Sequence, residues 1–144
     1  MFKKILVPTD GSALAQSAAT TAAQLAKSQG AEVIGVYVID PFPYIGIGDA
    51  SAVGLQAYLS EAKQAANRSL EVLADSCKQR GVAFAGDTIE RSVVYEGITE
   101  TAKAEGCDLI VMGSHGRKGV QALILGSVAQ KVLTHAKVPV LITK

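Results

Sequence analysis

The segment from Gly113 to Ser127 contains the residue types in this chain best suited to ligand chemistry. It reads Gly-Ser-His-Gly-Arg-Lys-Gly-Val-Gln-Ala-Leu-Ile-Leu-Gly-Ser and begins where an apolar run, Asp108 to Met112, ends. In an open parallel sheet, ligands bind beyond the carboxyl ends of the strands, and glycines let backbone N–H groups approach an anion without an intervening Cβ. The simplest ligand for such a loop is phosphate.

The spacing of the glycines differs from two common phosphate-binding fingerprints. Neither G-x-x-x-x-G-K-[ST] nor G-x-G-x-x-G occurs in the chain. The pattern is instead Gly113, two residues, Gly116, nine residues, Gly126 and then Ser127. Ser127 followed by Gln130 predicts a capping box for a helix that begins at Val128, and the free amides of a helix N-terminus favour a polyphosphate.

This glycine-serine pattern resembles the nucleotide-binding branch of the universal stress protein family. The resemblance extends to Lys4-Ile-Leu-Val-Pro-Thr-Asp-Gly-Ser, Asp108-Leu-Ile-Val-Met-Gly-Ser-His-Gly-Arg and Gly126-Ser-Val-Ala ending in Val138-Pro-Val-Leu-Ile, and so covers essentially the whole chain. It implies one universal stress protein domain of residues 1–144 with an adenine nucleotide alpha hydrolase-like fold. The implied ligand is ATP, or else AMP or ADP, with a Mg ion held through the phosphates.

The resemblance also implies a role for particular residues. The ribose would be lined by Pro8, Thr9 and Asp10 of the first turn, and the adenine would meet the backbone of Val38 in strand two. The sugar would lie over Met112 and Gly113 at the end of strand four. The phosphates would face the glycine loop and the start of the last helix, at Gly116, Arg117, Gly126, Ser127 and Val128, with Ser114 in the same binding set.

Other polar residues near these motifs have simpler interpretations. Asp10 either meets ribose hydroxyls, or it caps the first helix or braces the turn. Lys118 adds positive charge at the rim or is merely solvated. We interpret His115 as a neutral loop histidine facing solvent, and His135 as a helix C-terminal residue favoured by the dipole. Asp40, Tyr44 and Asp49 form either a lid or an ordinary surface loop.

The elements that must position this loop alternate between β-like and α-like segments. Apolar, β-branched runs predict strands at Lys4 to Val7, Glu32 to Ile39, Val82 to Glu90, Asp108 to Met112 and Val138 to Thr143. Helical spacing predicts helices at Ala13 to Ser28, Leu55 to near Gly81, Glu96 to Glu105 and Val128 to Thr134, with Ser12 and Gly30 bounding the first. Its stripe of alanines should lie close against a sheet. Pro41 to Gly54 is expected to be an irregular loop.

This alternation predicts the α/β class: a single doubly wound parallel sheet of five strands with four helices, flavodoxin-like or related. We expect the order 3-2-1-4-5, because the loops after strands one and four then open into one crevice. The Val82 to Glu90 strand is expected at one edge. Pro139 is disfavoured in a central strand, so Val138 to Thr143 should form the other edge and pair symmetrically in a homodimer.

Composition excludes several classes of function. Among 144 residues, 14 basic and 13 acidic side chains give a formal charge of +1, which argues against a nucleic-acid partner. Neither a signal peptide nor an apolar run of ~20 residues is present, so we expect no membrane partner and a cytoplasmic protein. Cys77 and Cys107 have no metal-ligand spacing and are expected to be reduced thiols.

The favoured function is a dimeric regulatory module in stress response. ATP occupancy would alter the Pro41 to Gly54 loop or the dimer contact, and an unidentified protein partner would respond. We expect no dedicated catalysis, but a slow ATPase or phosphotransferase stays open, with Asp10, His115 and Ser114 as weak candidates for its chemistry. A flavin-binding domain is a third possibility, because a related doubly wound order holds FMN.

Overall fold

The structure is a computed structural model, and it describes residues 1–41, 52–117 and 124–144. Five strands form one parallel sheet in the order β3-β2-β1-β4-β5, as predicted. The elements are β1 (Lys4–Pro8), α1 (Ala13–Gln29), β2 (Glu32–Ile39), α2 (Ala52–Lys78), β3 (Phe84–Glu90), α3 (Val94–Ala104), β4 (Leu109–Gly113), α4 (Ser127–His135) and β5 (Val140–Thr143).

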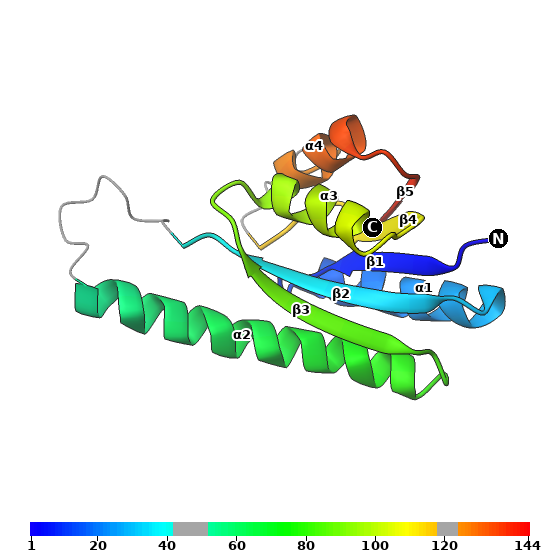
Figure 1. Cartoon of the computed structure of the whole chain (residues 1–144), viewed down its shortest axis with the longest axis horizontal. Helices are drawn as coiled ribbons and strands as arrows, with labels where there is room; N and C mark the ends of the chain where they lie inside the picture. The colour runs from blue at the N-terminus through cyan, green and yellow to red at the C-terminus, as the bar shows by residue number, and fades with distance from the viewer. Residues whose placement is uncertain (42–51, 118–123) are drawn as a thin grey trace.

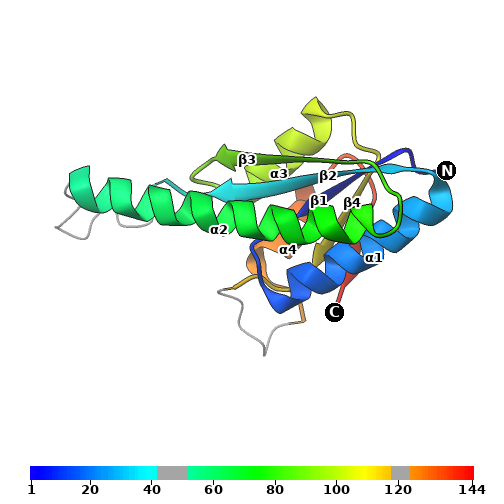
Figure 2. The ribbon, with the colours of Figure 1, turned by 90° about the horizontal axis from the view of Figure 1, so that it is seen from below.

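The helices cover the sheet from both sides. α1 and α2 pack on one face, and α3 and α4 pack on the other (Figure 1). The first turns of α2 project past the carboxyl end of β2, as Figure 2 also shows. Because the winding changes direction between β1 and β4, the segments that follow these two strands emerge side by side.

The first helix follows its sequence signals closely. The Ser12 hydroxyl accepts a hydrogen bond from the Ala15 amide, and Gly30 ends the helix in the left-handed conformation with φ +67°. Its buried face consists of alanines, which lets the helix lie close to β1 and β4, as expected. The buried residues are Ala15, Ala18, Ala19, Ala22, Ala23 and Ala26.

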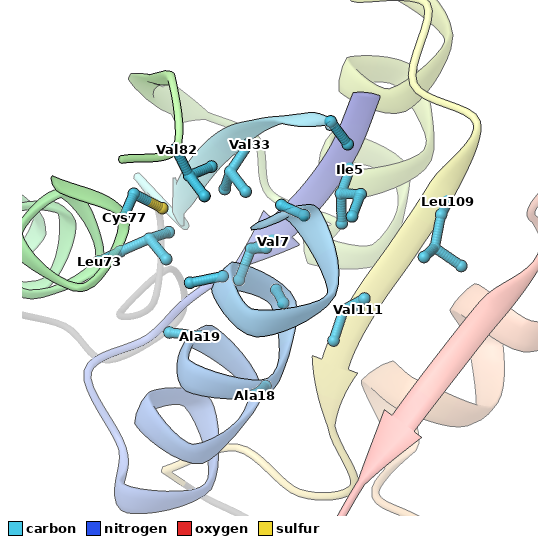
Figure 3. Close-up of a cluster of buried hydrophobic side chains, with 14 residues drawn as sticks. Ile5, Val7, Ala18, Ala19, Val33, Leu73, Cys77, Val82, Leu109 and Val111 are labelled. Atoms are coloured by element: carbon cyan, nitrogen blue, oxygen red, sulfur yellow. The ribbon is translucent and has the colours of Figure 1, made fainter. Parts of the chain in front are cut away.

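The core is divided by the sheet because neighbouring strand residues point to opposite faces. Ile5 and Val7 of β1 pack with α1 and with Leu73 of α2 (Figure 3), whereas Leu6 packs with Ile98 of α3. All three β1 side chains are fully buried. β1 is therefore held on both faces, which fixes the position of the segment that follows it.

Several predicted boundaries differ from the structure. α2 begins at Ala52 rather than Leu55, because Gly54 lies on an exposed turn where a glycine is tolerated within a helix. β3 begins at Phe84 rather than Val82, although Val82 is buried in the core. β5 begins after Pro139, which lacks an N–H but accepts a hydrogen bond from the Ile110 amide through its carbonyl. Tyr44, Asp49 and Lys118 lie outside the described residues.

Both edge strands are where the sequence predicted them, with β3 at one side of the sheet and β5 at the other.

The two cysteines are free and buried, and burial raises the pKa of the Cys107 thiol to about 11. Within the described ranges, the helices include none with the length and apolar character needed to traverse a bilayer.

Candidate functional site

A cavity opens at the carboxyl ends of β1 and β4, between the loops that follow them. It has a volume of about 100 Å³, and its inner walls are apolar side chains contributed by both β2 and α3, namely Val36, Val38, Val94 and Ile98. Its mouth carries backbone and polar groups of the two loops. Eight residues expected from the sequence to bind ligand line it: Pro8, Thr9, Asp10, Val38, Met112, Gly113, Gly116 and Val128.

Asp10 joins the two loops through its carboxylate. Its Oδ1 accepts a hydrogen bond from the Ser12 amide at 3.0 Å, and its Oδ2 accepts one from the Arg117 amide at 2.8 Å. The turn-bracing interpretation of Asp10 is therefore confirmed. The same carboxylate faces the cavity, so bracing and ligand contact are compatible.

Close packing explains the three motif glycines. A Cβ on Gly116 would lie 2.7 Å from the Asp10 carboxylate, and one on Gly113 would lie 3.1 Å from the backbone of Leu14. A Cβ on Gly126 would lie 3.1 Å from the carbonyl oxygen of Ser114. The glycines that were expected to let a phosphate approach therefore also let the loop after β4 pack closely against the loop after β1 and against α1.

The capping box expected at Ser127 is absent. Gly126 is the N-cap and makes no side-chain cap hydrogen bond, while Ser127 is the first helical residue and is exposed. The Gly126 amide donates to the Ser114 carbonyl at 2.7 Å, next to the end of β4, and the helix begins one residue earlier than predicted. The first turn of α4 therefore begins beside the cavity mouth with its amides uncapped by a side chain.

His115 is buried, with only 9% of its surface exposed, so the expectation that it faces solvent is wrong. It packs beside Gly126 and lines the cavity. Its Nδ1 lies 3.0 Å from the Ser114 hydroxyl. Ser114 is 3% exposed and does not line the cavity, because its side chain is directed to the histidine rather than to the opening.

Arg117 lies at the rim rather than in the cavity. Its guanidinium donates to the Tyr37 hydroxyl at 3.3 Å, toward α2. Like Ser114, Gly126 and Ser127, it is a predicted site residue that the cavity lining does not include. Sequence reasoning missed Ala15, Val36, Val94, Ile98, His115 and Ala129 as lining residues. For the apolar ones the sequence shows only core periodicity, which does not distinguish a cavity wall from ordinary packing.

The described residues bring together no group of three or more His, Cys, Asp or Glu side chains suited to a metal ion. The arrangement offers an apolar recess, a carboxylate at its mouth and an adjacent helix start. This combination can accommodate a flat apolar ring next to hydroxyl and anionic groups.

Comparison with protein families connects this geometry to known proteins. The model of the universal stress protein family matches residues 1–144. The chain belongs to the universal stress protein family. A universal stress protein of Methanocaldococcus jannaschii is 37% identical over 100% of this chain and 83% of its own length. The solved structure of MJ0577, from the same organism, superposes with a TM-score of 0.85 at 28% identity and covers 100% of this chain and 96% of that one.

Two other universal stress proteins of this fold have been solved with adenine nucleotides. One was crystallised in complex with cAMP, with a TM-score of 0.69 at 23% identity, covering 99% of this chain and 96% of that one. The other, from Archaeoglobus fulgidus, is in complex with dAMP, with a TM-score of 0.69 at 22% identity, covering 99% and 98%. At these identities the likeness establishes a shared fold.

Proposed function

We propose that this universal stress protein binds ATP, or AMP or ADP, in the cavity between the β1 and β4 loops. The observation that carries the proposal is the position of the cavity, which has an apolar interior and a mouth adjoining both Asp10 and the start of α4. The cAMP and dAMP complexes of proteins with the same fold support the ligand class.

The size of the cavity indicates which part of a nucleotide would be buried and which part would stay exposed. At about 100 Å³ it is smaller than typical ligand sites, which span roughly 300–1,000 Å³. The adenine would therefore enter the recess against Val38 and Ile98, while the ribose would lie at the mouth beside Asp10. The phosphates would remain open to solvent along the glycine loop.

The start of α4 supplies the electrostatic partner for those phosphates. The Gly126 and Arg117 amides already donate to Ser114 and Asp10. Among the described residues, the amides of Ser127 and Val128 at the helix start would face the phosphates. A Mg ion would be held mainly by the phosphates. The Ser114 hydroxyl is buried against His115 and does not line the cavity, so it is not presented to a phosphate, which favours binding over turnover as the role of the site.

The proposed biological role is regulatory. Nucleotide occupancy would change the segment from Pro41 to Gly54, of which residues 42–51 lie outside the described ranges, or the contact of a homodimer formed through the C-terminal segment Val138 to Thr143. An unidentified protein partner would respond in the cytoplasm. The edge position of β5 supports the dimer, because an edge strand presents backbone groups for pairing with another chain.

The test compares Ser127→Asp with Ser127→Ala. An acidic residue in the first helical turn stabilises the helix but repels a polyphosphate. We expect Ser127→Asp to keep the unfolding midpoint of the parent protein and to weaken ATP binding about tenfold, roughly 1.4 kcal/mol, by calorimetry. AMP, which carries fewer charges, should be affected less, and Ser127→Ala should retain ATP binding within about twofold.

These variants are preferable to glycine replacements. Valine at Gly113 or Gly126 would collide with the Leu14 or Ser114 backbone and so perturb folding as well as binding. A well-folded parent protein with no measurable affinity for adenine nucleotides would overturn the proposed function. If the parent and Ser127→Asp bind ATP equally, the proposed contact between the phosphates and the start of α4 is wrong.

A further inference from the structure

A polar groove adjoins the nucleotide cavity on the side of α2. It has a volume of about 210 Å³ and lies between the β1–α1 turn, α2 and the β4 loop. Thr9 and Asp10 line both the cavity and the groove. A ligand seated in the cavity therefore meets the groove at the Asp10 side of the mouth.

Two arginines bring positive charge to this groove. Arg68 of α2 and Arg117 of the β4 loop both line it, and both also line a neighbouring hollow of about 340 Å³ between β2 and α2. Neither arginine forms a salt bridge in the part of the chain that the structure describes. Two cations exposed in one groove are ready to bind an anion.

The groove keeps a net positive charge, with two arginines and one carboxylate among the described residues that line it. Asp10 is the acidic residue that lines it, and both of its oxygens accept backbone amides, from Ser12 and from Arg117 itself. Asp40 and Glu61 line the neighbouring hollow, which both arginines also line. The Arg117 guanidinium rests on the neutral Tyr37 hydroxyl, so it can turn toward an anion without breaking an ion pair.

We propose that Arg68 and Arg117 form a subsite for a phosphate group carried on the ribose of the bound nucleotide. The ligand class is an adenosine bisphosphate, with one phosphate at the 5′ position and a second on the 2′ or 3′ hydroxyl. In dinucleotide sites a carboxylate bonds the free ribose 2′ hydroxyl of NAD, whereas a nearby arginine accommodates the 2′-phosphate of NADP. This inference rests on the proposed function, since it requires the base to occupy the cavity.

The test measures the binding of AMP, adenosine 3′,5′-bisphosphate and adenosine 2′,5′-bisphosphate by calorimetry. The parent protein should bind at least one bisphosphate about tenfold more tightly than AMP, the gain expected of a charge-assisted contact. Arg68→Gln should bind AMP as the parent does but lose this preference to within about twofold. Arg68→Lys should fall between the two, because lysine keeps the charge but not the planar fork.

Lys78→Gln is the matched control. It removes one positive charge from an exposed position of the same helix, about 15 Å along the axis at 1.5 Å per residue, and should keep the full preference. The inference is overturned if AMP binds but neither bisphosphate binds more tightly, or if Arg68→Gln keeps the gain. An equal loss of ATP affinity in Arg68→Gln would assign the arginines to the 5′ tail and overturn it too. Failure of AMP itself to bind would overturn the proposed function beneath it.

Discussion

Asp10 couples the shape of the site to the stability of the protein. Its two oxygens each accept a backbone N–H, one from its own turn and one from the loop after β4. A carboxylate is the side chain of this size that offers acceptors in both directions. The residue therefore holds the mouth of the cavity in place before any ligand arrives.

Asp10→Asn should consequently destabilise the fold. The amide presents a donor to one of two backbone donors, so either Ser12 or Arg117 loses its acceptor, at a cost of about 1–3 kcal/mol. Urea denaturation would measure the loss. Asp87→Asn, on an exposed position of edge strand β3, makes the same chemical change and should have little effect. An unchanged unfolding midpoint in Asp10→Asn would contradict the bracing role.

Individual residues are where sequence reasoning succeeded and failed for identifiable reasons. The Ser12 cap and the Gly30 stop are local signals, and both are confirmed. His115 is buried and Gly126, not Ser127, is the cap at a point where Gly126 contacts Ser114 and His115. Local sequence patterns do not predict such a contact between two separate segments. Eight predicted site residues line the cavity, whereas its apolar wall resembled ordinary core.

The starts of β1 and β4 are tied together by Asp108. Its carboxylate accepts hydrogen bonds from the amides of Lys3 at 2.9 Å and Lys4 at 3.1 Å, at the amino-terminal ends of these strands and opposite the cavity. Burial acts to raise the pKa of Asp108, but the hydrogen bonds from these two amides and the charge of Lys3 outweigh it, so the pKa is lowered. The ionised carboxylate therefore stabilises the pairing of the two strands that carry the site.

The lowered pKa gives this contribution a defined pH dependence. A group with a depressed folded-state pKa contributes stability above its unfolded pKa, about 3.9 for Asp, and loses it as the pH falls through the folded value. Asp108→Ala should thus cost about 1 kcal/mol in urea denaturation at pH 7. The difference from the parent should shrink as the pH falls below about 4. A difference that is constant from pH 7 to pH 3 would contradict this origin.

Elements were predictable in type and order because their signals are periodic. The alanine stripe of α1 identifies the buried face of a helix, and the apolar run of β4 identifies a buried strand. Ends were less predictable. The extra residues at the start of α2 include an exposed Gly54, and β5 starts late because Pro139 has no N–H to donate.

The topology of the whole molecule follows from connection rules rather than from any single residue. Connections that join parallel strands through a helix are right-handed. Among the orders that this allows, the observed one places the loops after β1 and β4 in the same crevice. The same order leaves β5 at an edge with Leu141 40% exposed. Nothing else in the described chain covers the outer edge of that strand, since β4 pairs with its inner edge.

An uncovered apolar edge strand leads to the prediction of a homodimer. A two-fold axis beside β5 would pair the strand with its own copy and bury Leu141 against the partner. Leu141→Arg should then convert the dimer to a monomer in sedimentation velocity at micromolar concentration, because it places like charges close to the symmetry axis. Val53→Arg, at an apolar residue of α2 that is 77% exposed, adds the same charge far from β5 and should leave the dimer intact. A parent protein that sediments as a monomer under these conditions would rule out this assembly, and regulation would then have to act within a single chain.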